Sequence, residues 1–319
     1  MGGELLRGIA GRLAERWVAA LFSPAFAFWA GVAAVWVWAT QWDTVADKGL
    51  IGAMKSWTSG LGALPALAQA ALAVLPLLVI ALTGLLFSGL AFPVLRLLEG
   101  YWPRPAARLG QRRRRHWRGE AKDGRDRLRT LAAMSSPGPE DSAERAGLER
   151  TLRRLPANPD LCMPTRLGNI LRAGEARISA HYGLDPIIAW TRLWLVLPDR
   201  AREEATTARA SLDLAVQAMI GGVLFVPLAF WAWWAAPIGL AVALGAYRGR
   251  LLTAAARYAD IVESCFDVHR RLLYEALRWP VPASPEKEQS EGVRVSDYLR
   301  SGSRAATPVF TSGADDEQS

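Results

Sequence analysis

Residues 70–82 read AALAVLPLLVIAL and form the centre of the uncharged stretch that decides the fold of this chain. From residue 56 to residue 95, forty consecutive positions hold no Asp, Glu, Lys or Arg, and the run ends abruptly at Arg96. A helix that crosses the hydrocarbon core of a bilayer needs roughly 20 apolar residues. A run this long and uniform does not suit the core of a soluble domain of this size, so we expect an integral membrane protein embedded in a lipid bilayer.

Positive charge is concentrated directly after that stretch. The whole 319-residue chain has a net charge of +8, and residues 96–129 alone hold twelve Lys or Arg against four acids, an excess of +8. Placement beside a span fits the positive-inside rule and attraction to anionic lipids. A nucleic-acid groove would interleave several aromatic residues with the basic ones, and the densest part offers only Trp117. We predict no nucleic-acid partner.

The densest basic cluster has two interpretations. It is either a topology signal on a solvated helix face or a contact for anionic phospholipid headgroups. The residues that the lipid interpretation assigns to this contact are Arg112, Arg113, Arg114, Arg115 and Arg118.

Three further patterns predict the remaining spans. Residues 17–42 are uncharged and predict the first span, while a signal peptide is disfavoured because no small-x-small cleavage signal precedes Asp43. Residues 66–95 predict the second span, and residues 43–55 a short polar connection, flanked by tryptophans, on the outer side. Residues 214–247 are thirty-four uncharged positions, which suit two short spans joined by a turn or a re-entrant hairpin.

The expected architecture is therefore all-α, with four transmembrane segments arranged as two helical hairpins and long helical extensions into the cytosol. Both termini are expected in the cytosol. The predicted parts are an N-terminal amphipathic helix (1–16), the first hairpin (17–97), a basic helix with a cytosolic module (98–212), the second hairpin (213–247), C-terminal cytosolic helices (248–300) and a disordered tail (301–319).

The most individual part of the predicted module is residues 155–199, where proline, glycine and asparagine alternate with bulky apolar residues. This composition predicts ordered but irregular structure around a short helical piece. Trp190 and Trp194 are four positions apart, so on a helix they share one face. We predict that this face packs on another surface or binds a partner.

Motifs that would indicate catalysis or a cofactor are missing from the sequence. It contains no GxSxG, no GxxxxGK[ST] and no HExxH pattern, and its three histidines are far apart. We expect no enzyme activity, no cofactor and no metal. Cys162 and Cys265 both fall in predicted cytosolic segments, so a disulfide is not expected.

The predicted spans have no ionisable residue at mid-depth, which argues against ion-coupled transport. A channel can be lined by small polar groups instead. If the chain forms one, the pore candidates are Gln69, Thr83 and Gln217.

Two sequence patterns carry a resemblance to a known group of proteins. One is PTRLGN at residues 164–169 with YGLD at 182–185, and the other is FDxHR at 266–270 with LYxALxWP at 273–280. In these patterns the second half of the chain resembles uncharacterised multi-pass membrane proteins of high-GC actinobacteria. The resemblance implies a bacterial cytoplasmic membrane and a shared cytosolic module, and it implies no activity.

Two functions are compatible with these expectations. The first is a membrane anchor or scaffold whose cytosolic module binds another protein. The second is a homo-oligomeric ion channel. A homo-oligomer is expected for either, because four spans bury little by themselves and several carry small residues.

Overall fold

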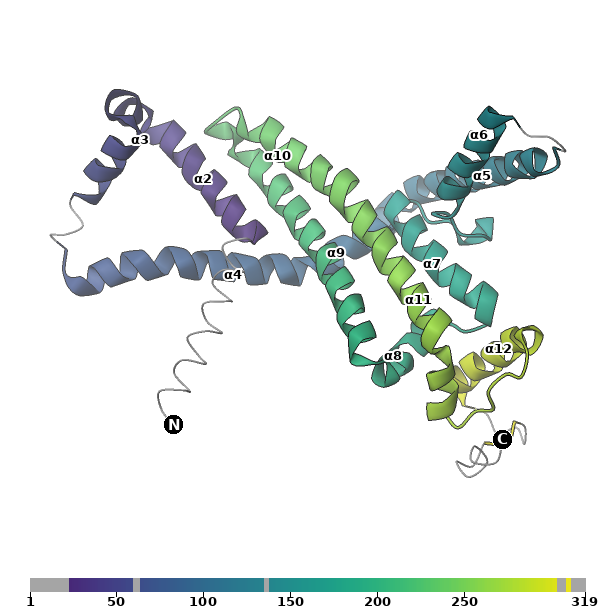
Figure 1. Ribbon diagram of the computed structural model, residues 1–319. Helices are drawn as coiled ribbons and strands as arrows, with labels where there is room; N and C mark the ends of the chain where they lie inside the picture. Colours follow the sequence, from purple (N-terminus) through teal and green to yellow (C-terminus); the bar gives the residue numbers. More distant parts are fainter. Residues whose placement is uncertain (1–22, 60–63, 135–137, 303–307, 311–319) are drawn as a thin grey trace, which may run out of the picture. The chain divides into compact units, whose positions relative to one another are not determined.

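A computed structural model describes residues 23–59, 64–134, 138–302 and 308–310 (Figure 1). In this part of the chain all regular structure is helical and there is no strand, which confirms the all-α expectation. The predicted helix at 1–16 and the first positions of the predicted first span lie outside the described residues.

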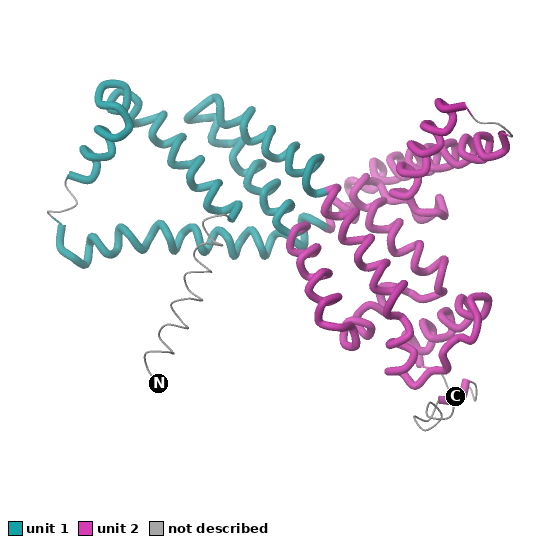
Figure 2. Tube along the Cα trace, in the orientation of Figure 1, with its two compact units in different colours: residues 1–95, 213–251 teal, residues 96–212, 252–319 magenta. Residues whose placement is uncertain are grey.

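The chain divides into two units, each assembled from two segments (Figure 2). Unit 1 comprises residues 1–95 and 213–251, and unit 2 comprises residues 96–212 and 252–319. The division falls inside two helices, α4 (Ala66–Glu99) and α9 (Asp199–Phe225), so each of these contributes residues to both units.

Unit 1 contains α2 (Pro24–Thr40), α3 (Trp42–Thr58) and the apolar parts of α4 and α9. After α9 the chain reverses through the short η4 (Val226–Phe230) into α10 (Ala235–Gly245) and a π-helical turn, η5 (Ala246–Leu251). Glycines let α9 and α10 approach closely. A Cβ atom on Gly222 would lie 2.7 Å from the backbone nitrogen of Ala243, and one on Gly239 would lie 2.7 Å from the carbonyl oxygen of Gly222.

Aromatic and polar contacts connect α2, α4 and α9 inside unit 1. The ring of Phe28 in α2 lies 6.0 Å from that of Phe87 in α4 and 6.4 Å from that of Phe225 in α9. The indole N–H of Trp29 donates to Thr83 Oγ1 at 2.9 Å. Such hydrogen bonds between apolar helices are what holds helices together where hydrophobic burial alone does not.

Two helical stretches among the described residues are long and apolar enough to cross a membrane, Ala66–Ala132 and Asp199–Phe230. In the most apolar 18-residue window of each, 6% and 39% of the residues are buried within the protein, respectively. The other predicted spans are shorter: α2 has 17 residues and α10 has 11. Length and composition therefore support two candidate spans, not the expected four.

One predicted connection in unit 1 is wrong. Residues 43–55 are not a loop but belong to helix α3, which is kinked at Gly49 where φ is +67°. The tryptophans around it do gather. The ring centroids of Trp36 and Trp57 are 5.9 Å apart, and those of Trp38 and Trp42 are 4.5 Å apart. Trp38 also lies 6.4 Å from Trp234, which directly precedes α10.

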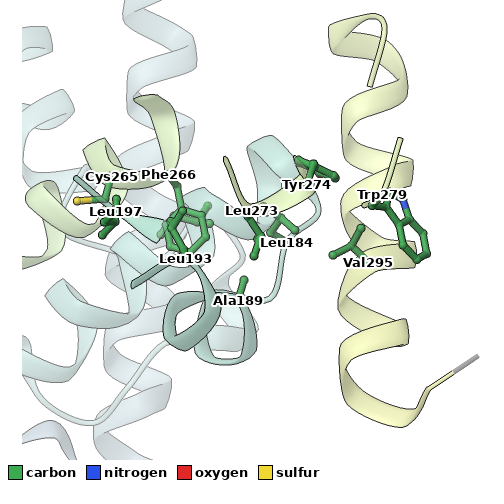
Figure 3. Packing of buried hydrophobic residues seen from close by; sticks show 11 residues of the cluster. Leu184, Ala189, Leu193, Leu197, Cys265, Phe266, Leu273, Tyr274, Trp279 and Val295 are labelled. Carbon is green, nitrogen blue, oxygen red and sulfur yellow. The ribbon is translucent and has the colours of Figure 1, made fainter. Parts of the chain in front are cut away.

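Unit 2 is a bundle of helices around its own core. It contains α5 (Ala107–Ala132), α6 (Pro139–Leu152), α7 (Arg166–Tyr182), α8 (Pro186–Val196), the first part of α9, α11 (Leu252–Ala276) and α12 (Pro285–Ser301). Figure 3 shows side chains from α8 and α11, with Trp279 and Val295, in one buried cluster. Leu193, Phe266 and Val295 are each 0% exposed there.

Residues 155–199 are more helical than expected. The glycines, prolines and polar residues that suggested irregular structure act at the ends of α7 and α8. Thr165 accepts the N–H of Gly168 to cap α7, Gly183 ends α7 with φ +67°, and Asp185 accepts the N–H of Ile187 to cap α8. These residue types favour helix ends, so the pattern marked the boundaries of two helices.

Two further helices of unit 2 lie within the predicted cytosolic parts. Helix α6 starts at Pro139 inside the module predicted at 98–212, and helix α12 starts at Pro285 inside the C-terminal helices predicted at 248–300. Of the predicted disordered tail, α12 includes Ser301 and residues 308–310 are described. The Phe310 ring lies 6.4 Å from that of Trp279.

Candidate functional site

An open pocket of about 360 Å³ lies in unit 2 between α8, α9 and α11. We call it the tryptophan pocket. Its lining residues are Trp190, Thr191, Trp194, Ala205, Thr206, Arg209 and Tyr258. The pocket brings together three aromatic rings, three hydroxyl groups and one guanidinium, and no acidic side chain is among the described residues that line it.

The two tryptophans predicted to share a face do so on α8. Their ring centroids are 5.6 Å apart with the planes tilted by 55°, and Trp190 also lies 6.1 Å from the ring of buried Phe266. Leu193, the residue between them that points inward, is 0% exposed. The core therefore fixes the position of α8, and the half-buried indoles form one wall of the pocket.

The opposite wall comes from α9 and α11. Ala205 is buried, while Thr206 is exposed and donates its hydroxyl hydrogen to the carbonyl oxygen of Arg202 at 2.5 Å. The guanidinium carbon of Arg209 lies 5.9 Å from the centre of the Tyr258 ring, a cation–π distance. The pocket thus combines apolar walls with positive charge, which suits an apolar group that carries or neighbours a negative charge.

Sequence reasoning found only one wall of this pocket. Arg209, Tyr258 and Thr206 were not singled out from the sequence. The three residues belong to two helices far apart in sequence from α8. Only packing brings them together, so no local spacing rule could have grouped them.

The motifs behind the resemblance have structural roles in unit 2. In the first motif, the side chain of Asn169 is 0% exposed, and its amide group accepts the N–H of Met163 at 2.7 Å and donates to the Met163 carbonyl at 3.1 Å. A Cβ atom on Gly168 would lie 2.0 Å from the carbonyl oxygen of Glu99. The motif closes a tight turn against the end of α4.

The second motif fastens α12 and α7 to α11. Tyr182 donates its hydroxyl hydrogen to Asp267 at 2.7 Å, and the guanidinium carbon of Arg270 stacks 4.3 Å from the centre of the Tyr182 ring. Arg270 also forms an ion pair with Glu288 of α12. Burial, followed by the hydrogen bond to Asp267, raises the pKa of Tyr182 to about 12.

Part of the basic cluster on α5 has a structural role. Arg113 donates to the carbonyl oxygen of Pro164 at 3.2 Å, and Arg118 donates to the carbonyl oxygen of Asp160 at 3.3 Å. Arg112, Arg114 and Arg115 are exposed. Contact with anionic headgroups stays a prediction for these three residues. The case for such a contact is weaker for Arg113 and Arg118, because their guanidinium groups already donate to backbone carbonyls.

The pore candidates are placed at helix contacts of unit 1. Thr83 accepts the hydrogen bond from Trp29, and Gln217 donates from Nε2 to Ser88 Oγ at 3.3 Å. Gln69 donates to the carbonyl oxygen of Leu64 next to the start of its own helix at 3.0 Å. These contacts explain the polar groups without a pore, and the channel stays a prediction.

Neither cysteine forms a disulfide, and both are buried. Burial raises the pKa of Cys162 and of Cys265, which disfavours the reactive thiolate. No group of three His, Cys, Asp or Glu side chains within the described residues is arranged to hold a metal ion.

No protein-family model, curated protein or solved structure matches this chain, so its function has to be argued from the geometry of the two units.

Proposed function

We propose that this chain is a non-enzymatic membrane protein in which unit 1 is embedded in the bacterial cytoplasmic membrane and unit 2 is a cytosolic module that binds another protein. One observation carries the membrane part: only 6% of the residues in the most apolar window of α4 are buried within the protein. Water is a poor environment for such a surface, and lipid tails are a good one.

The finer topology in this proposal is two hairpins with both termini in the cytosol. The contact of Trp38 with Trp234 supports it, because it brings the reversal after α2 and the reversal after α9 together at one end of unit 1. Tryptophan favours the headgroup level of a bilayer. Arg96, Arg248 and Arg250 follow the opposite ends of the apolar segments, as the positive-inside rule requires of a cytosolic side.

The binding role of unit 2 is supported by the composition of the tryptophan pocket. Trp, Tyr and Arg are the residues that contribute most to protein interfaces, where a side chain of the partner fills a desolvated pocket. The chemistry of the lining fits a partner segment with one bulky apolar side chain next to an acidic residue. The acidic residue would face Arg209 and the apolar side chain would face Trp190 and Trp194.

Extraction of membranes with alkaline carbonate tests the embedded part. We expect the full chain to stay in the membrane pellet, because the apolar surface of α4 has to be covered by lipid. Release of the full chain into the supernatant would refute the membrane proposal.

Site-specific photo-crosslinking of the full chain in cells tests the binding part. A photo-reactive amino acid replaces Thr191, which lines the pocket, or Ile187, which is 66% exposed on the same helix but does not. We expect one cross-linked protein from position 191 and none from position 187. Thr206→Trp, which fills the pocket, abolishes the cross-link, whereas Thr207→Trp on the neighbouring exposed position preserves it. Equal cross-linking in both variants would contradict the pocket as the binding site.

The proposal includes self-association, which is supported by the small share of the apolar window of α4 that is buried within one chain. Mass measurement of gently solubilised protein tests it, and a monomer counts against it.

A further inference from the structure

Unit 1 contains a second cavity, a groove of about 300 Å³ between α2, α9 and α10. Its lining residues are Ser23, Pro24, Ala27, Phe28, Gly31, Leu214, Ala218, Gly221, Gly222, Phe225, Ile238, Gly239, Val242 and Arg250. Among the described residues that line it, only Ser23 and Arg250 have polar side chains. The lining of the groove is therefore apolar except for Ser23 and one cationic side chain, that of Arg250.

The two polar residues mark the same end of the groove. Ser23 directly precedes α2, and Arg250 follows α10. The opposite ends of these helices meet where Trp38 lies 6.4 Å from Trp234. The apolar body of the groove therefore extends from the arginine end toward the tryptophan end of unit 1.

The dimensions of the groove fit one leaflet of a bilayer. Twelve residues separate Ile238 from Arg250, which corresponds to about 18 Å of helix at 1.5 Å per residue. One leaflet contributes about 15 Å of a hydrocarbon core that is about 30 Å thick. An acyl chain that enters the groove beside Arg250 reaches Ile238 near the middle of the bilayer.

Arg250 is placed to bind an anion at the entrance. It lies in the π-helical turn of residues 246–251, and such turns interrupt α-helices frequently at functional sites. The guanidinium is exposed, and no ion pair of Arg250 occurs within the described part of the chain. Its neighbour Arg248 is also exposed but does not line the groove.

We propose that this groove is a binding site for one anionic phospholipid of the cytosolic leaflet. The acyl chain lies between α2, α9 and α10, and the phosphate pairs with Arg250. The inference rests on the proposed embedding of unit 1 in the membrane. Charge complementarity favours this occupant over a helix from a second copy, because a helix would leave the guanidinium of Arg250 unpaired at the bilayer surface.

Native mass spectrometry of the full chain tests the site. The protein is taken from vesicles of equal parts phosphatidylglycerol and phosphatidylethanolamine into mild detergent, and the retained lipids are identified. We expect one phosphatidylglycerol per chain in the wild type and in Arg248→Gln. Arg250→Gln lowers its occupancy about fivefold, the factor that corresponds to the roughly 1 kcal/mol contributed by one basic residue at an anionic surface.

A second variant tests the apolar part of the groove, where the acyl chain is proposed to lie. Ala27 is exposed in the groove, and Ala27→Phe fills the space without opening the helix contacts. We expect it to lose the retained lipid while its thermal unfolding matches that of the wild type. Equal retention of phosphatidylglycerol in Arg250→Gln and Arg248→Gln, equal retention of the two lipids, or a second copy in place of lipid would overturn the inference.

Carbonate extraction of the same vesicles separates this failure from failure of the membrane proposal. If the chain stays in the pellet and Arg250→Gln behaves as Arg248→Gln, only the lipid site is wrong. If the chain is released, the embedding of unit 1 and the lipid site are both wrong.

Discussion

In unit 1 the side chain of Leu75 on α4 is 54% exposed, whereas in unit 2 that of Leu273 on α11 is 1% exposed. Both residues lie in regular helices of the same chain. Leu273 belongs to a cluster that buries residues of four helices and Trp279, while Leu75 has no comparable surroundings within its unit. The difference shows that unit 2 supplies its own apolar environment and that unit 1 needs one from outside.

Polar groups show the same contrast. Unit 2 holds its helices together with ion pairs, such as that between Arg177 of α7 and Glu263 of α11 at 2.7 Å. Between the helices of unit 1, the contacts are neutral hydrogen bonds such as Trp29 with Thr83, aromatic edges and close approaches of glycine. Charged pairs suit helices that face water, and small residues with neutral hydrogen bonds suit helices that face lipid.

The largest expected effect comes from charging the exposed leucines of α4. Leu75→Arg with Leu78→Arg places two guanidinium groups where each costs about 2.5–3.5 kcal/mol at the centre of a spanning helix. We expect the variant to leave the carbonate-resistant pellet. The matched control, Leu195→Arg with Val268→Arg in unit 2, alters residues that are 77% and 70% exposed and should be retained like the wild type. If both double variants left the pellet, the proposal that only unit 1 needs a lipid environment would be contradicted.

The second effect concerns the core of unit 2. Glu263 is 8% exposed and accepts from Arg177, whose side chain is 20% exposed. Removing one partner of a buried ion pair costs about 3–5 kcal/mol, and partial exposure lowers this to about 2–3 kcal/mol here. Glu263→Gln should lower the urea midpoint followed by tryptophan fluorescence. Glu275→Gln removes an exposed pair with Arg271 and should lower the free energy of unfolding by less than about 1 kcal/mol.

Removing the hydroxyl group from either of two tyrosines of unit 2 should change its stability by a smaller amount. Tyr182 donates to Asp267, so Tyr182→Phe should destabilise unit 2 by about 1 kcal/mol. The hydroxyl of Tyr274 is buried without a hydrogen-bond partner among the described residues, so Tyr274→Phe should be neutral or slightly stabilising. Urea titration of both variants measures this, and equal destabilisation would contradict the assigned partners.

Alkaline pH provides a related test with a defined sign. The pKa of Tyr182 is raised to about 12 in the folded protein, mainly by burial, above about 10 in the unfolded chain. The unfolded state therefore releases this proton first, and stability falls as pH rises from about 10 to about 12. Absorbance titration of the wild type against Tyr182→Phe measures it. A Tyr182 that titrates near 10 would show that its ring is not buried.

The smallest effect concerns thiol reactivity. Cys162 and Cys265 are buried, and burial raises the pKa of both thiols. Alkylation at neutral pH should therefore be slow in the native protein and should accelerate in urea. Rapid native labelling at either position would indicate that unit 2 opens locally near that cysteine.

The helices themselves were largely predictable, because periodicity and charge are local properties. Residues 66–95 were expected as a helical span and lie in α4, and the C-terminal helices expected at 248–300 correspond to α11 and α12. The kinked helix α3 was missed because its charged residues suggested a polar connection. The turn-forming residues of 155–199 were recognised in the sequence, but they were assigned to irregular structure and not to the ends of α7 and α8.

The sequence alone therefore determined the all-α class, the apolar segments and the concentration of positive charge after residue 95, since each follows from composition within a short window. Tertiary structure alone decided that Arg209 and Tyr258 face Trp190 and Trp194, and that Arg250 but not Arg248 lines the groove of unit 1. These sites are made by residues from three helices apiece. Their distances depend on how the helices pack, and packing depends on side chains that are far apart in the chain.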